Sequence, residues 1–254
     1  MVLIKNKIKI ITLIFFCLFC FTGCWDKFEP EERGFVTAMG IDKNSNGEFN
    51  ISLEVPETSM FKENSGGSSS EKETENSHTE TSSGSAIWSV VKDIDSKTDR
   101  RLDFGQIKVC VIGEAILKDK NLFKQTMDAL ERNKDIWRKV LVCTTKGRAE
   151  DILKGYTGER KTVGFFVTSY FNNNKKNTDS TLNKDLQEVL IELSMSGNTV
   201  LPLVFLNEGE IIFDGMSIIN DYSFSGYGKN EIMKGYNIIK EDIEETEIVA
   251  DIMV

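Results

Sequence analysis

The chain has 254 residues, with 40 acidic side chains against 31 lysines and arginines, which gives a formal net charge of −9. Because an acidic surface is repelled by nucleic acid and by anionic lipid, this charge argues against DNA or RNA as a partner and against electrostatic attachment to a membrane. With only one histidine, the chain also has few ligands for a metal site, and we expect no metal and no cofactor.

The first 23 residues have the features of a targeting signal. Three lysines lie within residues 5–9, and an almost wholly apolar run follows at residues 10–21. This run is shorter than the roughly 20 residues that a membrane-spanning helix needs, and its length is typical of a signal peptide. The next residues, FTGC at positions 21–24, resemble the lipobox of bacterial lipoproteins, although Phe21 replaces the usual leucine.

We therefore predict cleavage before Cys24 and attachment of lipid to this cysteine, on the outer face of the cytoplasmic membrane. The alternatives are ordinary secretion and retention of the apolar run as an anchor helix. Without residues 1–23 the chain has 28 basic and 40 acidic residues, which is a net charge of −12. A protein of this charge must be held at a membrane by acyl chains, and two chains suffice for stable anchoring.

The mature chain begins with a pattern of strands. Alternating apolar residues predict strands at 34–41 and 48–55, joined by a polar turn at 42–47. This turn copies the first half of an EF-hand calcium loop, but the twelfth position is Leu53 instead of glutamate. We interpret it as a turn in which Asn46 and Gly47 have positive φ. The segment from Lys62 to Ser85 contains no large apolar residue, so we expect a disordered insertion there.

The remaining elements follow from hydrophobic spacing. Helices are predicted at residues 87–94, 122–130, 148–154 and 182–193, the last of which ends at Gly197. Strands are predicted at 106–112 and 139–145, and a hairpin around Asp214-Gly215 is predicted to pair 211–213 with 216–219. Because strands and helices mix without a strict βαβ alternation, the expected fold class is α+β, with mixed sheets and packed helices.

Few side chains suggest catalysis. His78 lies in the predicted insertion, where no fixed neighbour could orient it as a general base. Cys110 and Cys143 each lie in an apolar strand, so they are either small buried side chains or a disulfide, which an extracytoplasmic location would permit. No motif for a nucleophile, a phosphate or a dinucleotide occurs, and we expect no catalytic residues and no enzymatic activity.

Several segments, taken in order, carry a family resemblance. GCWDK at residues 23–27 leads into GFV at 34–36 and GIDK at 40–43. The later segments are RLDFGQIKVCVIGE at 101–114, DALERNKDIWR at 128–138, KGRAEDIL at 146–153, FDGMSII at 213–219 and FSG at 224–226. Together they resemble the Ger(x)C lipoproteins, which are the C subunits of nutrient germinant receptors in spore-forming bacteria. The segment at 101–114 is similar to the family's central strand and turn, with Gln106 where we expect histidine.

The resemblance implies a lipid-anchored, non-enzymatic subunit of the spore inner membrane. Such a subunit assembles with two integral-membrane subunits, A and B, so that nutrients trigger germination. The resemblance also implies an N-terminal domain at residues 24–200 and the start of an α/β C-terminal domain at 201–254. Because family members continue well beyond this point, we expect a C-terminally shortened chain. A substrate-binding lipoprotein of a transporter is the main alternative, and an envelope enzyme is a further one.

Individual residues of these segments have simple structural interpretations. We expect Trp25, close to the lipidated end, to lie at the membrane interface, where the indole group is favoured. Trp137 is expected in the core, and Arg132 and Arg138 are expected at the surface or in salt bridges.

Overall fold

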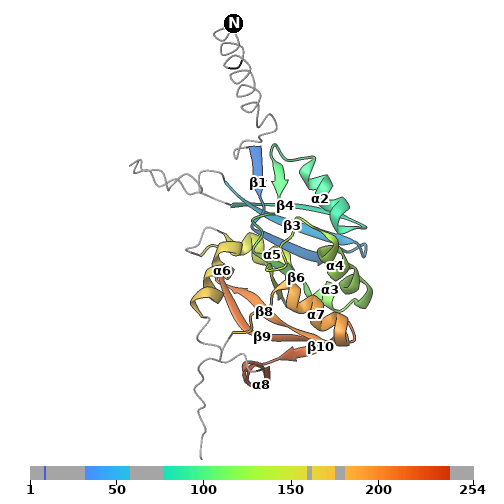
Figure 1. Ribbon diagram of the computed structural model, residues 1–254, viewed down its shortest axis with the longest axis vertical. Coiled ribbons are helices and arrows are strands. Elements are labelled where there is room, and N and C mark those ends of the chain that lie inside the picture. Colours follow the sequence, from blue (N-terminus) through green and yellow to red (C-terminus); the bar gives the residue numbers. More distant parts are fainter. Residues whose placement is uncertain (1–8, 10–31, 58–76, 159–161, 175–180, 241–254) are drawn as a thin grey trace, which may run out of the picture.

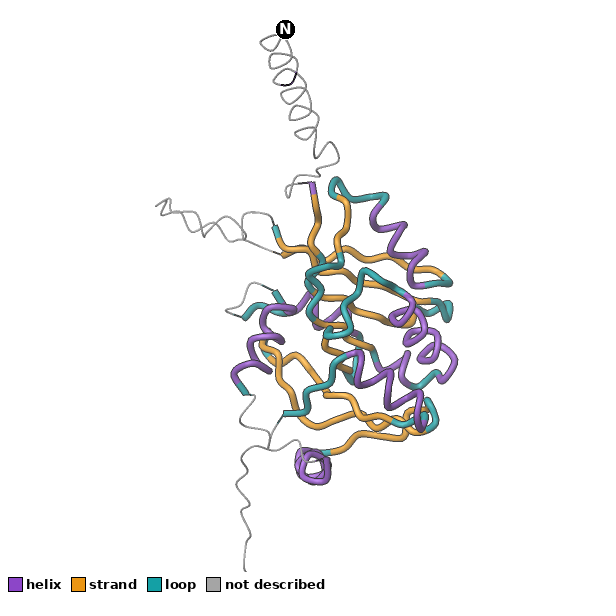
Figure 2. Tube along the Cα trace, viewed as in Figure 1, coloured by secondary structure: helices purple, strands orange, loops and turns teal. Residues whose placement is uncertain are grey.

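The computed structural model describes residue 9 and residues 32–57, 77–158, 162–174 and 181–240. Its centre is an eight-stranded sheet with the strand order β10-β9-β8-β7-β6-β2-β3-β4, and helices cover both faces (Figures 1 and 2). A small second sheet joins β1 (Arg33–Phe35) in parallel to β5 (Arg101–Asp103). The predicted class, α+β with mixed sheets and packed helices, is confirmed.

The middle of the large sheet is parallel, and both of its sides are antiparallel. The parallel strands are β2 (Ala38–Lys43), β6 (Val109–Ile112), β7 (Leu141–Thr144) and β8 (Thr199–Asn207). The antiparallel strands are β3 (Phe49–Pro56), β4 (Ser77–Gly84), β9 (Glu210–Asn220) and β10 (Ser223–Gly228). The carboxyl ends of the four parallel strands therefore lie along one edge of the sheet.

The helices divide between the two faces of the sheet. One face carries α2 (Ile87–Asp95), α3 (Glu114–Leu117), α4 (Lys120–Arg132) and α7 (Leu186–Ser196). The other face carries α5 (Ala149–Gly155) and α6 (Val163–Asn173), and α8 (Asn230–Lys240) packs against β9 and β10. Local caps fix two of these helices, because Asp119 caps α4 and Asp185 forms a capping box with Glu188 at α7.

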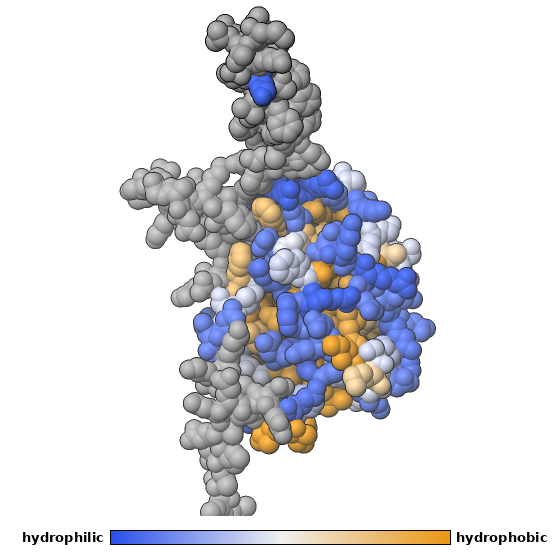
Figure 3. Space-filling view, viewed as in Figure 1, coloured by the Kyte–Doolittle hydropathy of each residue, from blue (hydrophilic) through white to orange (hydrophobic). Residues whose placement is uncertain are grey.

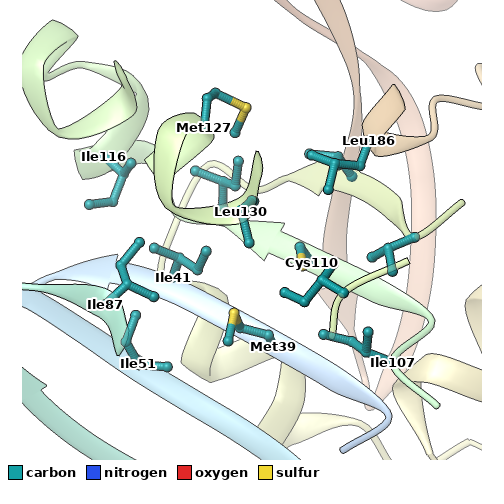
Figure 4. Packing of buried hydrophobic residues seen from close by; sticks show 14 of the residues in the cluster. Met39, Ile41, Ile51, Ile87, Ile107, Cys110, Ile116, Met127, Leu130 and Leu186 are labelled. Atoms are coloured by element: carbon teal, nitrogen blue, oxygen red, sulfur yellow. The ribbon is translucent and has the colours of Figure 1, made fainter. Parts of the chain in front are cut away.

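Two apolar cores lie on opposite faces of the sheet, because successive side chains of a strand point to opposite sides. Met39 and Ile41 of β2 belong to the first core, beneath α2, α3, α4 and α7 (Figure 4). Ala38 of the same strand and Val109 of β6 belong to the second core, beneath α5 and α6. Because helices cover both faces of the sheet, a central strand such as β6 is apolar along its whole length.

The alternation of side chains along the strands also determines whether Cys110 and Cys143 can form a disulfide. Cys110 faces the first core and Cys143 of the neighbouring strand faces the second. A disulfide needs Cβ atoms about 3.5–4.5 Å apart that point toward one another, which opposite faces of a sheet do not allow. The interpretation of both residues as small buried side chains is therefore confirmed. Burial raises the pKa of the Cys110 thiol to about 12.

The predicted disorder of Lys62 to Ser85 is wrong for the last part of that segment. Residues 77–84 form β4, which pairs with β3 from Ser77 opposite Pro56 to Gly84 opposite Phe49. A polar sequence can form this strand because β4 is the edge of the sheet, where its side chains remain half-exposed. The hydroxyl of Ser82 also donates a 2.5 Å hydrogen bond to Asp93 of α2. Residues 62–76 lie outside the described residues.

The predicted hairpin at Asp214-Gly215 is also wrong, because β9 continues through these two residues. They form a bulge opposite the single residue Leu203 of β8. Gly215 has a φ of 83°, and a Cβ atom there would lie only 2.3 Å from the carbonyl oxygen of Gly228. An Asp-Gly pair signals positive φ, but it does not distinguish a bulge from a turn.

The turns that bound β9 lie at both of its ends. Glu208 and Gly209 connect β8 to β9 with φ values of 49° and 83°. Asp221 and Tyr222 connect β9 to β10 with φ values of 47° and 58°. Positive φ at both central residues is the requirement of the type I′ turn, which matches the twist of two-residue hairpins.

Among the remaining elements, the helices predicted at 87–94, 122–130 and 148–154 are confirmed as α2, α4 and α5. The helix predicted from residue 182 begins only at Leu186, and it ends at Gly197 as expected, with a φ of 73°. The sequence did not predict α6, whose apolar residues lack one clear helical face, or β8, which contains a proline. The predicted domain boundary after residue 200 falls inside β8.

Candidate functional site at the carboxyl ends of the parallel strands

The carboxyl ends of β2, β6 and β7 are joined by backbone hydrogen bonds, and ligands of α/β sheets commonly bind at such an edge. The amide of Gly113, after β6, donates to Ile41 at 2.9 Å, and the amide of Thr145, after β7, donates to Ile112 at 3.0 Å. The amide of Glu114 donates to Gly147 at 3.1 Å. Three segments far apart in the sequence thus form one continuous edge.

Asp42 at the end of β2 is the central side chain of this edge. Its two carboxylate oxygens accept hydrogen bonds from the amides of Ala149 at 2.8 Å and Glu150 at 2.9 Å. These are the first amides of α5, which has no capping bond from the side chain of its own N-cap residue, Arg148. Burial raises the pKa of Asp42, and this effect exceeds the opposing effect of the two amide bonds. Asp42 therefore fixes α5 on the sheet.

Two glycines make the approach of Asp42 and α5 possible. A Cβ atom on Gly113 would lie 2.0 Å from a carboxylate oxygen of Asp42. A Cβ atom on Gly40 would lie 3.2 Å from the Cβ of Ala149, so the helix could not pack as closely on β2. Glycine at both positions follows from the packing of α5 against the strand ends.

Glu54 of β3 forms the same arrangement at the other end of the strands, opposite to the end where Asp42 lies. Its carboxylate accepts hydrogen bonds from the amides of Val163 at 2.8 Å and Gly164 at 3.3 Å, which begin α6. The hydroxyl of Thr37 donates a third bond, at 2.8 Å. Burial raises the pKa of Glu54, as it does for Asp42. Each of the two helices on this face is therefore held by a buried carboxylate of the sheet.

Glu114, at the carboxyl ends of the parallel strands, contacts a tyrosine and a lysine side chain. Glu114 accepts a 2.7 Å hydrogen bond from the hydroxyl of Tyr227 in β10 and lies 2.9 Å from the ammonium of Lys118. These two bonds lower the pKa of Glu114, whereas burial and the contact with Glu114 raise the pKa of Tyr227. The ammonium of Lys146 lies 4.9 Å from the centre of the Tyr227 ring. The hydrogen bond between Tyr227 and Glu114 fixes β10 against the turn that follows β6.

The turn with the half calcium motif is confirmed as a turn. The side-chain oxygen of Asn44 accepts hydrogen bonds from the amides of Asn46 and Glu48, both at 2.9 Å. Gly47 has a φ of 84°, whereas Asn46 does not have the positive φ that we predicted. The carboxylate of Asp42 points to α5 and not into this turn, and the described residues contain no group of side chains that could hold a metal ion.

The other residues considered in the sequence lie in different places. His78 is in β4, where the half-exposed ring lies 3.8 Å from Glu80, so its predicted place in a disordered insertion is wrong. Trp137 is 68% exposed, so its predicted burial is also wrong, because the loop between α4 and β7 buries Ile136 and directs Trp137 outward. Arg132 pairs with Asp128 at 2.8 Å, as expected of a surface residue.

Cys24 and the whole apolar run lie outside the described residues, so the structure does not test the predicted lipidation site. None of the helices in the described part of the chain has the length and apolar character needed to cross a bilayer.

A family model described as the spore germination protein N-terminal domain matches residues 26–206. The chain belongs to this family. The match covers the sheet as far as β8 and includes Asp42, Glu54 and both helices that they hold.

Curated relatives come from Bacillus subtilis (strain 168). Putative spore germination protein YfkR is 24% identical over 149 residues, which cover 59% of this chain and 38% of the relative. Spore germination protein A3 is 25% identical, with coverage of 85% and 56%, and spore germination protein YndF is 23% identical, with coverage of 87% and 59%. The chain spans 38–59% of the length of these relatives. It also matches a crystal structure of the GerBC protein at 12% identity with a TM-score of 0.42, over 81% of this chain and 56% of that one.

The segments that suggested this family from the sequence meet in two places. GIDK at 40–43, the end of the segment at 101–114 and KGRAEDIL at 146–153 meet around Asp42 at the carboxyl edge. The beginning of the segment at 101–114 and DALERNKDIWR at 128–138 meet at the opposite end of the parallel strands, around the exposed Trp137. The sequence did not single out Asp42 as a helix cap or Glu54 at all, because their partners lie more than 100 residues away.

We predict that Asp42→Asn and Glu54→Gln each lower the free energy of unfolding by about 1–3 kcal/mol. Each variant keeps the shape of the side chain but replaces an acceptor oxygen by an amide nitrogen, which leaves one buried backbone N–H of α5 or α6 without an acceptor. Urea unfolding followed by circular dichroism measures the change. Asp99→Asn removes an exposed carboxylate and serves as the matched control, with an expected change within about 0.5 kcal/mol. Equal stability of all three variants would contradict the capping role.

Proposed function

We propose that this protein is a lipid-anchored subunit of a spore nutrient germinant receptor. The observation that carries the proposal is the match of residues 26–206 to the spore germination family, which begins two residues after Cys24 of the lipobox-like sequence. Relatives in this family include the proteins named spore germination protein A3, KC and B3. This match favours a role in germination over the alternative of a transporter's substrate-binding lipoprotein.

The proposed location is the outer face of the cytoplasmic membrane, which becomes the inner membrane of the spore. The basic residues and short apolar run before Cys24 support export and lipidation. A net charge of −12 without residues 1–23 supports attachment through acyl chains, since such a protein gains little from electrostatic attraction to anionic lipid.

The proposed role is assembly with the two integral-membrane subunits, A and B, and not catalysis. Three observations support it. The thiol of Cys110 is buried with a pKa of about 12, so it is not a thiolate nucleophile at neutral pH. His78, on an edge strand, is about half-exposed and lies 3.8 Å from Glu80. The charged groups at the carboxyl edge are paired with one another, which suits a surface that holds a fold together better than a reacting site.

Deletion of the gene in a spore former, followed by complementation, tests the receptor role. Complementation uses a host that lacks all of its own C subunits, so that redundant receptors cannot hide the effect. We expect this chain to restore nutrient-triggered germination, measured as the loss of optical density, whereas germination by calcium dipicolinate stays unchanged throughout. Failure to restore the nutrient response, with the protein present in the spore membrane, would contradict the proposed function of this chain.

The anchor is tested separately with Cys24→Ala. Because Cys24 is the proposed acceptor of lipid, we expect the variant to incorporate no radiolabelled palmitate and to keep residues 1–23 when its mass is measured. The matched control, Cys20→Ala, removes a neighbouring cysteine of the signal and should be labelled and cleaved normally. Labelling of the Cys24→Ala protein would show that lipid is attached elsewhere.

A further inference from the structure

A tryptophan stands exposed at the amino ends of the parallel strands. Trp137 is 68% exposed, whereas Trp88 is packed against Phe104 and donates a 2.8 Å hydrogen bond from its indole nitrogen to Ala129. Trp137 lines two hollows of about 590 and 440 Å³. We call Trp137 and the charged residues that line these hollows the Trp137 surface.

The Trp137 surface is less acidic than the rest of the protein. Its cations are Arg33, Arg101, Lys108, Lys134 and Lys139. Its carboxylates are Asp103, Asp135, Asp185 and Glu188. Asp103 pairs with Arg33 at 2.8 Å and Asp185 pairs with Lys139 at 2.7 Å. Five cations against four carboxylates leave no excess of negative charge here, although the whole chain carries −9.

This surface adjoins the point where the chain enters the domain from Cys24. Arg33 lines one of the two hollows and follows Cys24 by nine residues, which can span at most about 30 Å even when fully extended. β1 lies at one end of the described domain and α8 lies at the other (Figure 1). On the face that Figure 3 shows, the described residues at the β1 end are mostly hydrophilic, whereas hydrophobic residues gather at the α8 end. The exposed apolar residues of α8 are Ile232, Ile238 and Ile239.

We propose that the Trp137 surface lies against the headgroup layer of the bilayer that holds the anchor. This inference rests on the proposed function, because it takes the anchor at residue 24 as given. An indole group is favoured at the membrane interface, and lysine and arginine extend long apolar stems while their charged ends bind lipid phosphates. The short tether holds this end of the domain near the membrane, and its balanced charge removes the repulsion that the rest of the surface would experience.

The contact is tested with the full chain reconstituted into phosphatidylcholine and phosphatidylglycerol vesicles, with or without bromine on the lipids near the headgroups. Trp25→Phe is the background, so that only Trp88 and Trp137 emit. We expect brominated lipid to quench this protein, and we expect the quenching to disappear in Trp25→Phe/Trp137→Phe. Lys134→Glu should weaken the quenching because it reverses a charge of the surface, whereas the matched variant Lys229→Glu, next to α8, should not.

Two results would overturn the proposal. Equal quenching with and without Trp137 would show that this side chain does not reach the lipid. Protection of Trp137 from acrylamide in the vesicle sample, without quenching by brominated lipid, would show that another copy or another part of this chain covers the surface, and not lipid. The apolar run of an unprocessed chain also holds the protein on the vesicle, so this readout does not depend on lipidation of Cys24. Failure of the anchor in the palmitate experiment is therefore distinguishable from failure of this contact.

Discussion

The fold depends on two carboxylates that extend from the sheet to the first amides of distant helices. Asp42 and Glu54 are buried, and a buried carboxylate is costly unless hydrogen-bond donors surround it. The N-terminal amides of α5 and α6 supply these donors, together with the favourable end of each helix dipole. The requirement is mutual, because the same amides would otherwise be buried without acceptors. Each carboxylate thereby fixes where a helix begins and which strand it covers.

The two ends of the parallel strands differ: the residues around Asp42 hold the fold together, whereas those around Trp137 are exposed and can contact a partner. Around Asp42, close packing through Gly40 and Gly113 leaves the polar groups bonded to one another. At the other end of the parallel strands, Trp137 contributes little to the core and lies between charged hollows. Segments typical of the family contribute to both places. The subunit role that we propose would need both a sheet with fixed helices and an exposed surface of defined shape.

The sequence predicted those features that depend on local patterns. The spacing of Ile87, Val90, Val91 and Ile94 was sufficient for α2, and the lipobox-like end and the order of motifs were sufficient for the family. Features that depend on distant partners could not be predicted. The polar composition of β4 suggested disorder because its pairing with β3 is not visible in its own residues. Asp42 was assigned only to a turn, because its helix begins 107 residues later.

Amide hydrogen exchange of Asp42→Asn tests most sharply whether each buried carboxylate fixes its own helix. Exchange reports local opening, so it separates the loosening of one helix end from a general loss of stability. We expect faster exchange of the amides of Ala149 and Glu150 at the start of α5. Exchange at Val163 and Gly164 of α6, which Glu54 holds, should stay unchanged. Glu54→Gln should give the reverse pattern. Unchanged exchange at Ala149 and Glu150, or an equal increase at both helices, would contradict the claim that each carboxylate fixes its own helix.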